Sequence, residues 1–216
     1  MKIFVDTANL EEIKKLNDWK LINGVTTNPS LIAKSDRDFK QAIIEICSIV
    51  DGPVSAEVIA VDCEEMVKEG QALSRLHRNV VVKLPLTKDG LKAIHVLSQQ
   101  QIKTNATLVF SAVQALLAAK AGATYVSPFI GRLDDIGENG MKLVEDIITI
   151  YNHYGFDTQV LVASIRNLDH VYKATVLGAH CVTCPSHIIY QLLEHPLTNI
   201  GLKKFLDDWN NSNKKI

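Results

Sequence analysis

The sequence is poor in several kinds of feature, and each shortage excludes a class of protein. Only four of the 216 residues are cysteines, too few for the disulfide framework of a small secreted domain. No apolar run is long enough to cross a bilayer. The 23 basic and 24 acidic residues leave a net charge of -1 with no block of like charge, so nothing indicates a nucleic-acid or membrane-binding partner. The first six residues become charged too early for a signal peptide, and we expect a cytoplasmic protein.

Metal-ligand patterns are also lacking. The seven histidines fall at no metal-ligand spacing. Cys181 and Cys184 form one C-x-x-C pair, but a zinc site would need a second pair. The pair lies in a predicted strand and does not open a helix, unlike a thioredoxin-type motif. We therefore expect small core residues here, with no metal and no cofactor.

What the sequence does contain is a repeated alternation of short apolar segments and amphipathic stretches. Its 47% hydrophobic and 22% charged residues are typical of a globular protein. The predicted strands are Lys2 to Asp6, Gly24 to Thr27, Val54 to Val58, Val80 to Leu84, Thr104 to Val109, Tyr125 to Phe129, Val160 to Ala163 and Cys181 to Cys184.

The stretches between these strands have apolar residues at helical spacing, and glycines stand where several of them return to the next strand. The predicted helices are 10–16, 38–50, 64–76, 89–100, 111–121, 143–154, 168–177 and 186–194. Eight strand–helix units imply a parallel sheet and favour a closed α/β fold, the (β/α)₈ TIM barrel. We expect one domain over residues 1–216, with 196–216 as a C-terminal helical extension.

The extension has an apolar stripe that needs a surface to cover it. Leu202, Phe205, Leu206 and Trp209 lie on one face of the predicted helix. The stripe could pack back on its own barrel or dock on a neighbouring subunit.

The most unusual strand contains a lysine. Val80 to Pro85 reads VVVKLP, a short apolar run typical of a fully buried strand. Desolvation disfavours the charged form of an amine, and a neutral amine can attack a carbonyl to form a Schiff base. Alternatively, Lys83 extends to solvent from the strand end or pairs with a carboxylate.

In a barrel of this class, catalytic groups lie at the carboxyl ends of the strands. Polar residues stand at or beyond the predicted strand ends, and they converge on Lys83: Asp6, Asn28, Glu57, Asn105, Thr107, Ser127, Arg132, Ser164, Arg166 and Thr183. Each has an ordinary alternative role. Asp6 or Asn28 could cap a helix, Glu57 could pair with a neighbour, Ser127 and Ser164 could bond to loop backbone, and the arginines could form solvated ion pairs.

Four motifs give these residues a more specific meaning. They are VTTNPSLI (25–32), VVKLP (81–85), SPFIGR (127–132) and ASIRN (163–167). Together, and in this order, they resemble the signatures of the transaldolase family, whose small members include fructose-6-phosphate aldolases. The resemblance spans essentially the whole chain.

The resemblance implies a role for each matching residue. Lys83 would be the Schiff-base nucleophile and Asp6 the base for the C4 hydroxyl of a ketose. Glu57 and Thr107 would hold a water that moves protons during Schiff-base formation and release. The substrate-binding residues would be Asn28, Asn105 and Ser127 for the dihydroxyacetone unit, Phe129 beside it, and Arg132, Ser164 and Arg166 for the phosphate.

Two activities of the family remain to be distinguished. Aldolases of the family are usually described with glutamine and tyrosine at the positions of Glu57 and Phe129, so these two residues favour transaldolase. We expect transfer between sugar phosphates of the pentose phosphate pathway, such as sedoheptulose 7-phosphate, fructose 6-phosphate, erythrose 4-phosphate and glyceraldehyde 3-phosphate. The alternatives are an aldolase that releases dihydroxyacetone and a barrel that binds sugar phosphates without catalysis. Short members of the family are commonly decamers, which favours docking of the C-terminal helix on a neighbour.

Overall fold

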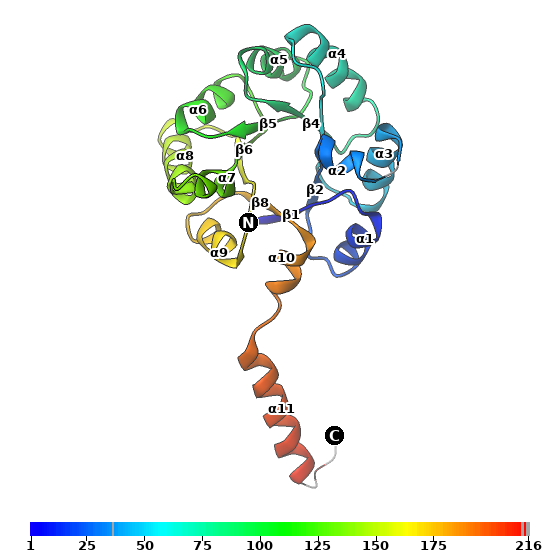
Figure 1. Ribbon diagram of the computed structural model, residues 1–216, viewed down its shortest axis with the longest axis vertical. Coiled ribbons are helices and arrows are strands. Elements are labelled where there is room, and N and C mark those ends of the chain that lie inside the picture. The colour runs from blue at the N-terminus through cyan, green and yellow to red at the C-terminus, as the bar shows by residue number, and fades with distance from the viewer. Residues whose placement is uncertain (36, 213, 215–216) are drawn as a thin grey trace.

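Eight parallel strands form a closed barrel in sequence order, as Figure 1 shows in a view down the ring. The computed structural model describes residues 1–35, 37–212 and 214. The strands are β1 Lys2–Asp6, β2 Gly24–Thr26, β3 Val54–Glu57, β4 Val80–Pro85, β5 Thr104–Val109, β6 Tyr125–Pro128, β7 Gln159–Val162 and β8 Cys181–Cys184. The predicted (β/α)₈ TIM barrel is confirmed, and each strand lies within about a residue of its predicted bounds.

All the helices except α11 lie around this barrel (Figure 1). They are α1 Leu10–Asp18, α2 Pro29–Ala33, α3 Phe39–Ile49, α4 Cys63–Ser74, α5 Lys88–Gln99, α6 Ala112–Lys120, α7 Ile130–Asp135, α8 Gly140–Tyr154, α9 Leu168–Val176, α10 Ser186–Gln191 and α11 Pro196–Asn211. Two short helices, α2 and α7, were not predicted. The sixth strand ends one residue earlier than predicted, at Pro128, and residues 130–135 after it are helical.

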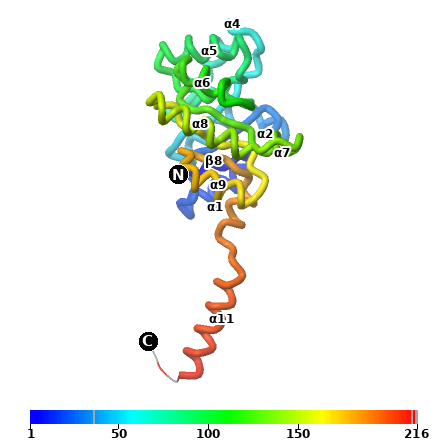
Figure 2. Tube along the Cα trace, turned by 90° about the vertical axis from the view of Figure 1, so that its left-hand side faces the viewer, coloured from blue at the N-terminus to red at the C-terminus, as the bar shows by residue number. Residues whose placement is uncertain are grey.

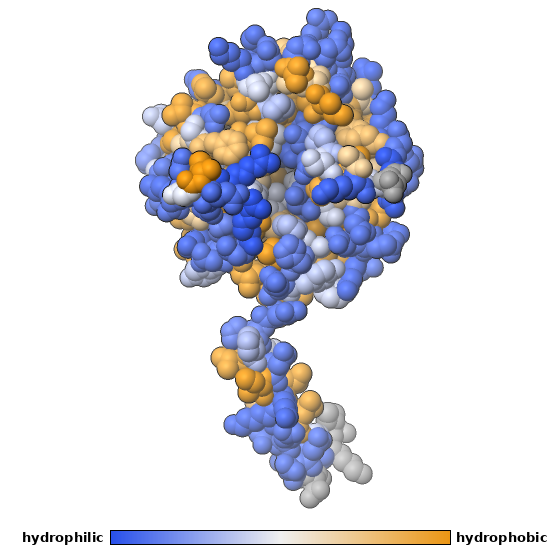
Figure 3. All heavy atoms as spheres, in the orientation of Figure 1, coloured by the Kyte–Doolittle hydropathy of each residue, from blue (hydrophilic) through white to orange (hydrophobic). Residues whose placement is uncertain are grey.

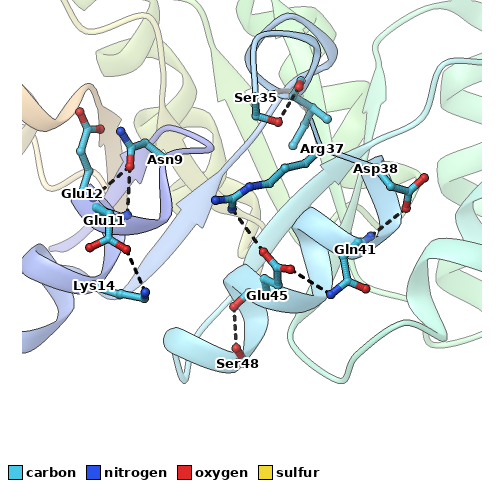
Figure 4. Close-up of polar contacts among 11 residues, drawn as sticks. Asn9, Glu11, Glu12, Lys14, Ser35, Arg37, Asp38, Gln41, Glu45 and Ser48 are labelled. Carbon is cyan, nitrogen blue, oxygen red and sulfur yellow. Dashed lines mark hydrogen bonds and ion pairs between the residues drawn. The ribbon is translucent and has the colours of Figure 1, made fainter.

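Side-chain caps explain where the longer helices begin. The Asn9 side-chain oxygen accepts hydrogen bonds from the backbone N–H groups of Glu11 and Glu12 at 3.0 and 3.4 Å. The Asp38 carboxylate accepts one from Gln41 at 3.0 Å, and both caps are drawn in Figure 4. Such caps satisfy N–H groups that have no partner within the helix, so a local pattern was sufficient to place α1 and α3.

The interior of the barrel is apolar at its amino end. Phe4, Val81, Tyr125, Leu161 and Cys181 form a separate buried cluster there. A Cβ atom at residue 24 would lie 2.9 Å from the ring of Phe4, so glycine on β2 allows that ring to cross the barrel. Two residues further along four of these five strands the inward-facing positions are polar (Asp6, Lys83, Ser127 and Thr183), and the candidate site begins there.

The two cysteines of β8 behave as core residues. Cys181 and Cys184 are both buried and lie in the strand, as predicted. Burial raises the pKa of the Cys181 thiol to about 11 and that of the Cys184 thiol to about 12. Both groups are therefore neutral thiols near pH 7, which is the less reactive form.

Helix α11 extends away from the barrel, as Figures 1 and 2 show from two directions. It has no buried residue, and Phe205 and Trp209 remain 71% and 41% exposed. Packing of the stripe on its own barrel is therefore wrong. Docking on a neighbour stays a prediction. The division into one domain with an extension over 196–216 also stays a prediction, and residues 213, 215 and 216 of that extension lie outside the described residues. Among the described helices, none is long and apolar enough to cross a membrane.

Candidate active site

A cavity of about 230 Å³ opens at the carboxyl ends of the strands. In Figure 3 the face that carries α2 and α7 is hollowed at the centre of the ring, with many hydrophilic residues around the hollow. Eight of the eleven predicted site residues line this cavity: Asp6, Asn28, Lys83, Ser127, Phe129, Arg132, Ser164 and Arg166. The other three do not line it: Glu57 lies on β3, and Asn105 and Thr107 lie on β5. These are the two strands that pair with β4, which carries Lys83.

Lys83 is buried and held by two contacts. Its side chain is 6% exposed, and its Nζ lies 2.9 Å from Glu57 Oε2. Nζ also donates a hydrogen bond to the Thr27 carbonyl at 3.1 Å. Strand register places Glu57, Lys83 and Asn105 side by side on β3, β4 and β5, so their side chains point to the same side of the sheet. The lysine does not extend to bulk solvent. It pairs with a carboxylate inside the site, which is compatible with a catalytic role.

Asp6 ends a chain of two hydroxyl groups. Thr26 Oγ1 donates to Asp6 Oδ1 at 2.6 Å and lies 2.7 Å from Thr183 Oγ1. Because Thr26 uses its hydrogen on the carboxylate, Thr183 must donate to Thr26. Burial raises the pKa of the Asp6 carboxyl, and the Thr26 hydrogen bond and the charge of Lys83 oppose that rise without cancelling it. Asp6 does not cap a helix, and its carboxylate lines the cavity, where it can accept a proton from a ligand.

A buried polar network lies beside the lysine. Ser127 Oγ donates to Asn105 Oδ1 at 2.8 Å, and Asn105 Nδ2 donates to Ser55 Oγ at 3.3 Å. Thr107 is fully buried, and its hydroxyl has no hydrogen-bond partner within the described part of the chain. Leu108 has a φ of 57°, where β5 shifts register against β6. Bulges of this kind change the direction of neighbouring side chains.

Asn28 serves the fold and lines the cavity at once. Its Oδ1 accepts from the Leu31 N–H at 3.0 Å and caps α2. The capping alternative is therefore correct, but it uses only the oxygen of the amide. The two N–H donors of the same group remain for a ligand in the cavity.

Both predicted arginines line the cavity, and each contacts a neighbouring side chain. The Arg132 guanidinium lies 5.1 Å from the ring centroid of Phe129, a cation–π arrangement. Arg166 donates to Asp135 Oδ2 at 2.8 Å, with both side chains more than half exposed. The solvated ion-pair alternative thus holds for Arg166, and such pairs are weak enough to exchange for a phosphate.

The loop between β7 and α9 is strained where it approaches α7. Ser164 has a φ of 62°, a conformation that costs about 1–3 kcal/mol for a residue other than glycine. Its carbonyl accepts the Gly131 N–H at 3.1 Å. A Cβ at residue 131 would lie 2.2 Å from that carbonyl oxygen and 2.6 Å from Arg166 Nε. Glycine is therefore required for α7 and this loop to approach so closely.

Thr26 was not among the residues expected at the site, and Thr183 was expected among the polar strand ends but without a role of its own. Both line the cavity and support Asp6. Two signals were available: Thr26 lies within the VTTNPSLI motif, and Thr183 stands near the end of the eighth strand. Asp135, which holds Arg166, had no signal, because α7 itself was not predicted.

Known proteins resemble this chain over nearly its whole length. The model of the family described as Transaldolase/Fructose-6-phosphate aldolase matches residues 3–216. A probable transaldolase of Clostridium kluyveri is 57% identical over 209 residues, covering 97% of each chain. One of Clostridium botulinum is 57% identical over 214 residues, covering 99% of this chain and 100% of the relative. Another, of Caldicellulosiruptor saccharolyticus, is 56% identical over 216 residues and covers both chains completely.

Proposed function

The chain belongs to the Transaldolase/Fructose-6-phosphate aldolase family, and on this basis we propose that it is a transaldolase. It would transfer a dihydroxyacetone unit from a ketose phosphate, such as sedoheptulose 7-phosphate or fructose 6-phosphate, to an aldose phosphate. Family membership supports transaldolase- or aldolase-type activity on sugar phosphates. We further propose that the reaction passes through a Schiff base, that it transfers the dihydroxyacetone unit and does not release it, and that it serves the pentose phosphate pathway.

The observation that supports it most is the environment of Lys83. An amine that is almost fully buried lies 2.9 Å from a carboxylate and faces a cavity that two arginines also line. Transfer of one proton from Nζ to Oε2 frees the lone pair for attack on a carbonyl.

The first half of the reaction consumes the donor. Lys83 Nζ attacks the C2 carbonyl of the ketose, and loss of water from the resulting carbinolamine gives an iminium ion. Asp6 accepts the proton of the C4 hydroxyl while the C3–C4 bond breaks. The electron pair of that bond moves into the iminium to form an enamine, and an aldose phosphate leaves. The raised pKa of the Asp6 carboxyl suits this step, because it makes the carboxylate a better base.

The second half reverses these steps with a new aldehyde. The enamine attacks the acceptor carbonyl, Asp6 returns its proton to the new C4 hydroxyl, and water releases the product ketose from Lys83. Glu57 would orient this water and move its protons together with Thr107, whose hydroxyl has no hydrogen-bond partner among the described residues. Asn28, Asn105 and Ser127 would hold the dihydroxyacetone unit. Of these three residues, Asn105 does not line the cavity, so it would act indirectly, through its neighbours.

Phosphate would bind at the side of the cavity formed by α7 and the loop after β7. Arg132, Ser164 and Arg166 line this side. The exposed contact between Arg166 and Asp135 can give way to a phosphate that offers two oxygens to the planar guanidinium. The position agrees with the general preference of such barrels for phosphate at the loops after the last strands.

Phe129 and Glu57 favour transfer over release of dihydroxyacetone. An aldolase must protonate the enamine, and a hydroxyl or an acid near the carbanion helps to place that proton. Phe129 lines the cavity and has no donor. Glu57 is engaged with Lys83 at 2.9 Å. The enamine would therefore survive until an acceptor aldehyde arrives.

The first test measures release of glyceraldehyde 3-phosphate from fructose 6-phosphate, with and without erythrose 4-phosphate. Release that depends on the acceptor is the expected result. Equal release without acceptor would identify an aldolase and refute the argument from Phe129 and Glu57.

A second test separates an enzyme from a barrel that binds sugar phosphates without catalysis. Borohydride reduction in the presence of fructose 6-phosphate should leave an adduct on the peptide that contains Lys83, detected by mass spectrometry. Lys83→Met should abolish the adduct. The control variant Lys120→Met, at the exposed end of α6, should keep it. A wild-type protein without an adduct would refute the Schiff base.

The uncovered stripe of α11 supports a homo-oligomer as the working form, and short members of the family suggest a decamer. Six large apolar residues of α11 are exposed: Leu197, Ile200, Leu202, Phe205, Leu206 and Trp209. An apolar helix face of this length is rarely left in water, and a second copy of the chain could cover it.

A further inference from the structure

His170 connects the loop after β7 to α7 through both of its ring nitrogens. The side chain lies in the first turn of α9 and is 9% exposed. Nδ1 accepts a hydrogen bond from the backbone N–H of Arg166 at 3.2 Å. Nε2 lies 2.9 Å from Asp134 Oδ2. Since Nδ1 is the acceptor, Nε2 bears the proton and donates it to Asp134.

Asp134 uses both carboxylate oxygens in this arrangement. Oδ2 receives the imidazole N–H, and Oδ1 accepts from the backbone N–H of Gly140 at 3.0 Å, at the start of α8. An amide in its place would offer only one acceptor oxygen. The carboxylate therefore joins three elements: α7, the start of α8 and, through His170, the backbone of Arg166.

The backbone held in this way is the part of the site that most needs support. Ser164 is strained at a φ of 62°, and the Arg166 side chain is more than half exposed. Arg132 is on α7, the same short helix as Asp134. No side chain caps the amino end of α7. The two arginines thus lie on a short helix and a loop, and the contact between His170 and Asp134 joins these two segments.

We propose that His170 and Asp134 are positioning residues for the phosphate group of the substrate. They fix the distance between the segment that carries Arg132 and the one that carries Ser164 and Arg166, so that one phosphate can contact both. Neither residue lines the cavity, so they act through other groups and not on the substrate. The inference rests on the proposed function only in that it takes the ligand of these arginines to be a sugar phosphate.

Two substitutions at residue 170 separate the two contacts. In His170→Asn, the side-chain oxygen can occupy the place of Nδ1 and keep the bond from the Arg166 N–H, but the contact with Asp134 is lost. In His170→Gln, the side-chain amide can reach the place of Nε2 and donate to Asp134, but the bond to Arg166 is lost. Asp134→Asn weakens the same connection from the other side and tests it without changing the histidine.

The control is a second histidine with the same kind of contact. His180 Nδ1 accepts from the backbone N–H of Val160 at 3.1 Å. That contact lies at the amino end of the barrel, before β8, whereas the cavity lies at the carboxyl end. His180→Asn and His180→Gln therefore remove a comparable histidine and leave the phosphate side unchanged.

Two measurements are made on each full-length variant. One is the KM for fructose 6-phosphate together with the inhibition constant of inorganic phosphate. The other is borohydride trapping of dihydroxyacetone on Lys83, which reports the Schiff base with a ligand that has no phosphate. Small displacements of binding groups cost up to about 100-fold. We expect KM and the phosphate inhibition constant to rise roughly tenfold or more in His170→Gln, His170→Asn and Asp134→Asn, because each removes or weakens one of the two contacts that form the link. Dihydroxyacetone trapping should be unchanged.

The outcomes discriminate between the two proposals. If the His170 and Asp134 variants keep the wild-type phosphate inhibition constant, the positioning role is wrong. It is also wrong if dihydroxyacetone trapping falls as far as phosphate binding, or if the His180 variants show the same loss, because the histidine then supports the barrel as a whole. If the wild-type protein traps neither dihydroxyacetone nor fructose 6-phosphate, the proposed function fails instead.

Discussion

Replacing Glu57 with glutamine tests how strongly the site depends on its buried ion pair. Lys83 Nζ and Glu57 Oε2 are 2.9 Å apart, and the two side chains are 6% and 13% exposed. Glutamine keeps the shape of the side chain but leaves the ammonium of Lys83 without a counter-charge. Breaking a buried pair from one side costs about 3–5 kcal/mol. We expect Glu57→Gln to lower the free energy of unfolding by about 3 kcal/mol, the low end of that range, because the Thr27 carbonyl still accepts from Nζ.

The reverse substitution should cost less. Lys83→Met leaves the Glu57 carboxylate, which is the more exposed partner and retains more contact with water. Removal of both charges in Lys83→Met/Glu57→Gln should cost less than the sum of the two single losses, because apolar replacement of a whole buried pair is often neutral or better. The expected interaction energy between the two sites is about 2 kcal/mol, within the range for residues in contact.

The assay is urea unfolding at pH 7, followed by circular dichroism at one protein concentration, because association of subunits stabilises the folded state. A loss of 3 kcal/mol corresponds to a fall in Tm of about 6–12 °C for a chain of this size. Lys68→Met is the matched control: this lysine contacts Glu64 and Glu65 on the exposed face of α4, and its loss should be hardly measurable. Additive single effects, or a Glu57→Gln variant as stable as the wild type, would refute the reasoning.

Three further variants test the selectivity of the site, the base Asp6 and the role of α11. Phe129→Tyr combined with Glu57→Gln should gain acceptor-independent release of glyceraldehyde 3-phosphate, since tyrosine adds a donor at the cavity wall; no gain would contradict the explanation of selectivity. In Thr26→Val, Asp6 loses the hydrogen bond that lowers its pKa, while burial still raises it. Because the base must be ionised, the acid limb of the kcat/KM profile should move to higher pH, and a shift to lower pH would show that the sign is wrong. Deletion of residues after Pro196 should dissociate the assembly in sedimentation velocity, and an oligomer that survives the deletion would show that α11 does not hold it.

The strands could be predicted closely because their signal is local. A run such as VVVKLP is apolar at every position except Lys83, and only a strand that is covered on both faces needs that pattern. The same holds for helices with side-chain caps, such as α1 with Asn9 and α3 with Asp38. In these segments each residue favours the structure that the whole fold requires.

Helix α7 shows why other segments could not be predicted. It has six residues and no side-chain cap. The N–H groups of Ile130 and Gly131 in its first turn bond to the carbonyls of Ala163 and Ser164, which lie more than thirty positions later in the chain. No nearby residue encodes these partners, so no local pattern indicates the helix. The ion pair of Arg166 with Asp135 and the contact between His170 and Asp134 depend on the same helix.

The sequence by itself determined the barrel and the chemical character of its carboxyl end. Alternating apolar and amphipathic segments require eight parallel strands, and parallel strands bring their last residues together at one end. Lys83 and its polar neighbours were therefore identifiable from their places on the strands. The tertiary structure decided which of these groups are in contact. Glu57 pairs with Lys83 from outside the cavity, two threonines form a hydrogen-bonded chain to Asp6, and α7 sets the spacing of the arginines. Hydrogen bonds between side chains depend on distances of tenths of an ångström, and only the packed chain defines those distances.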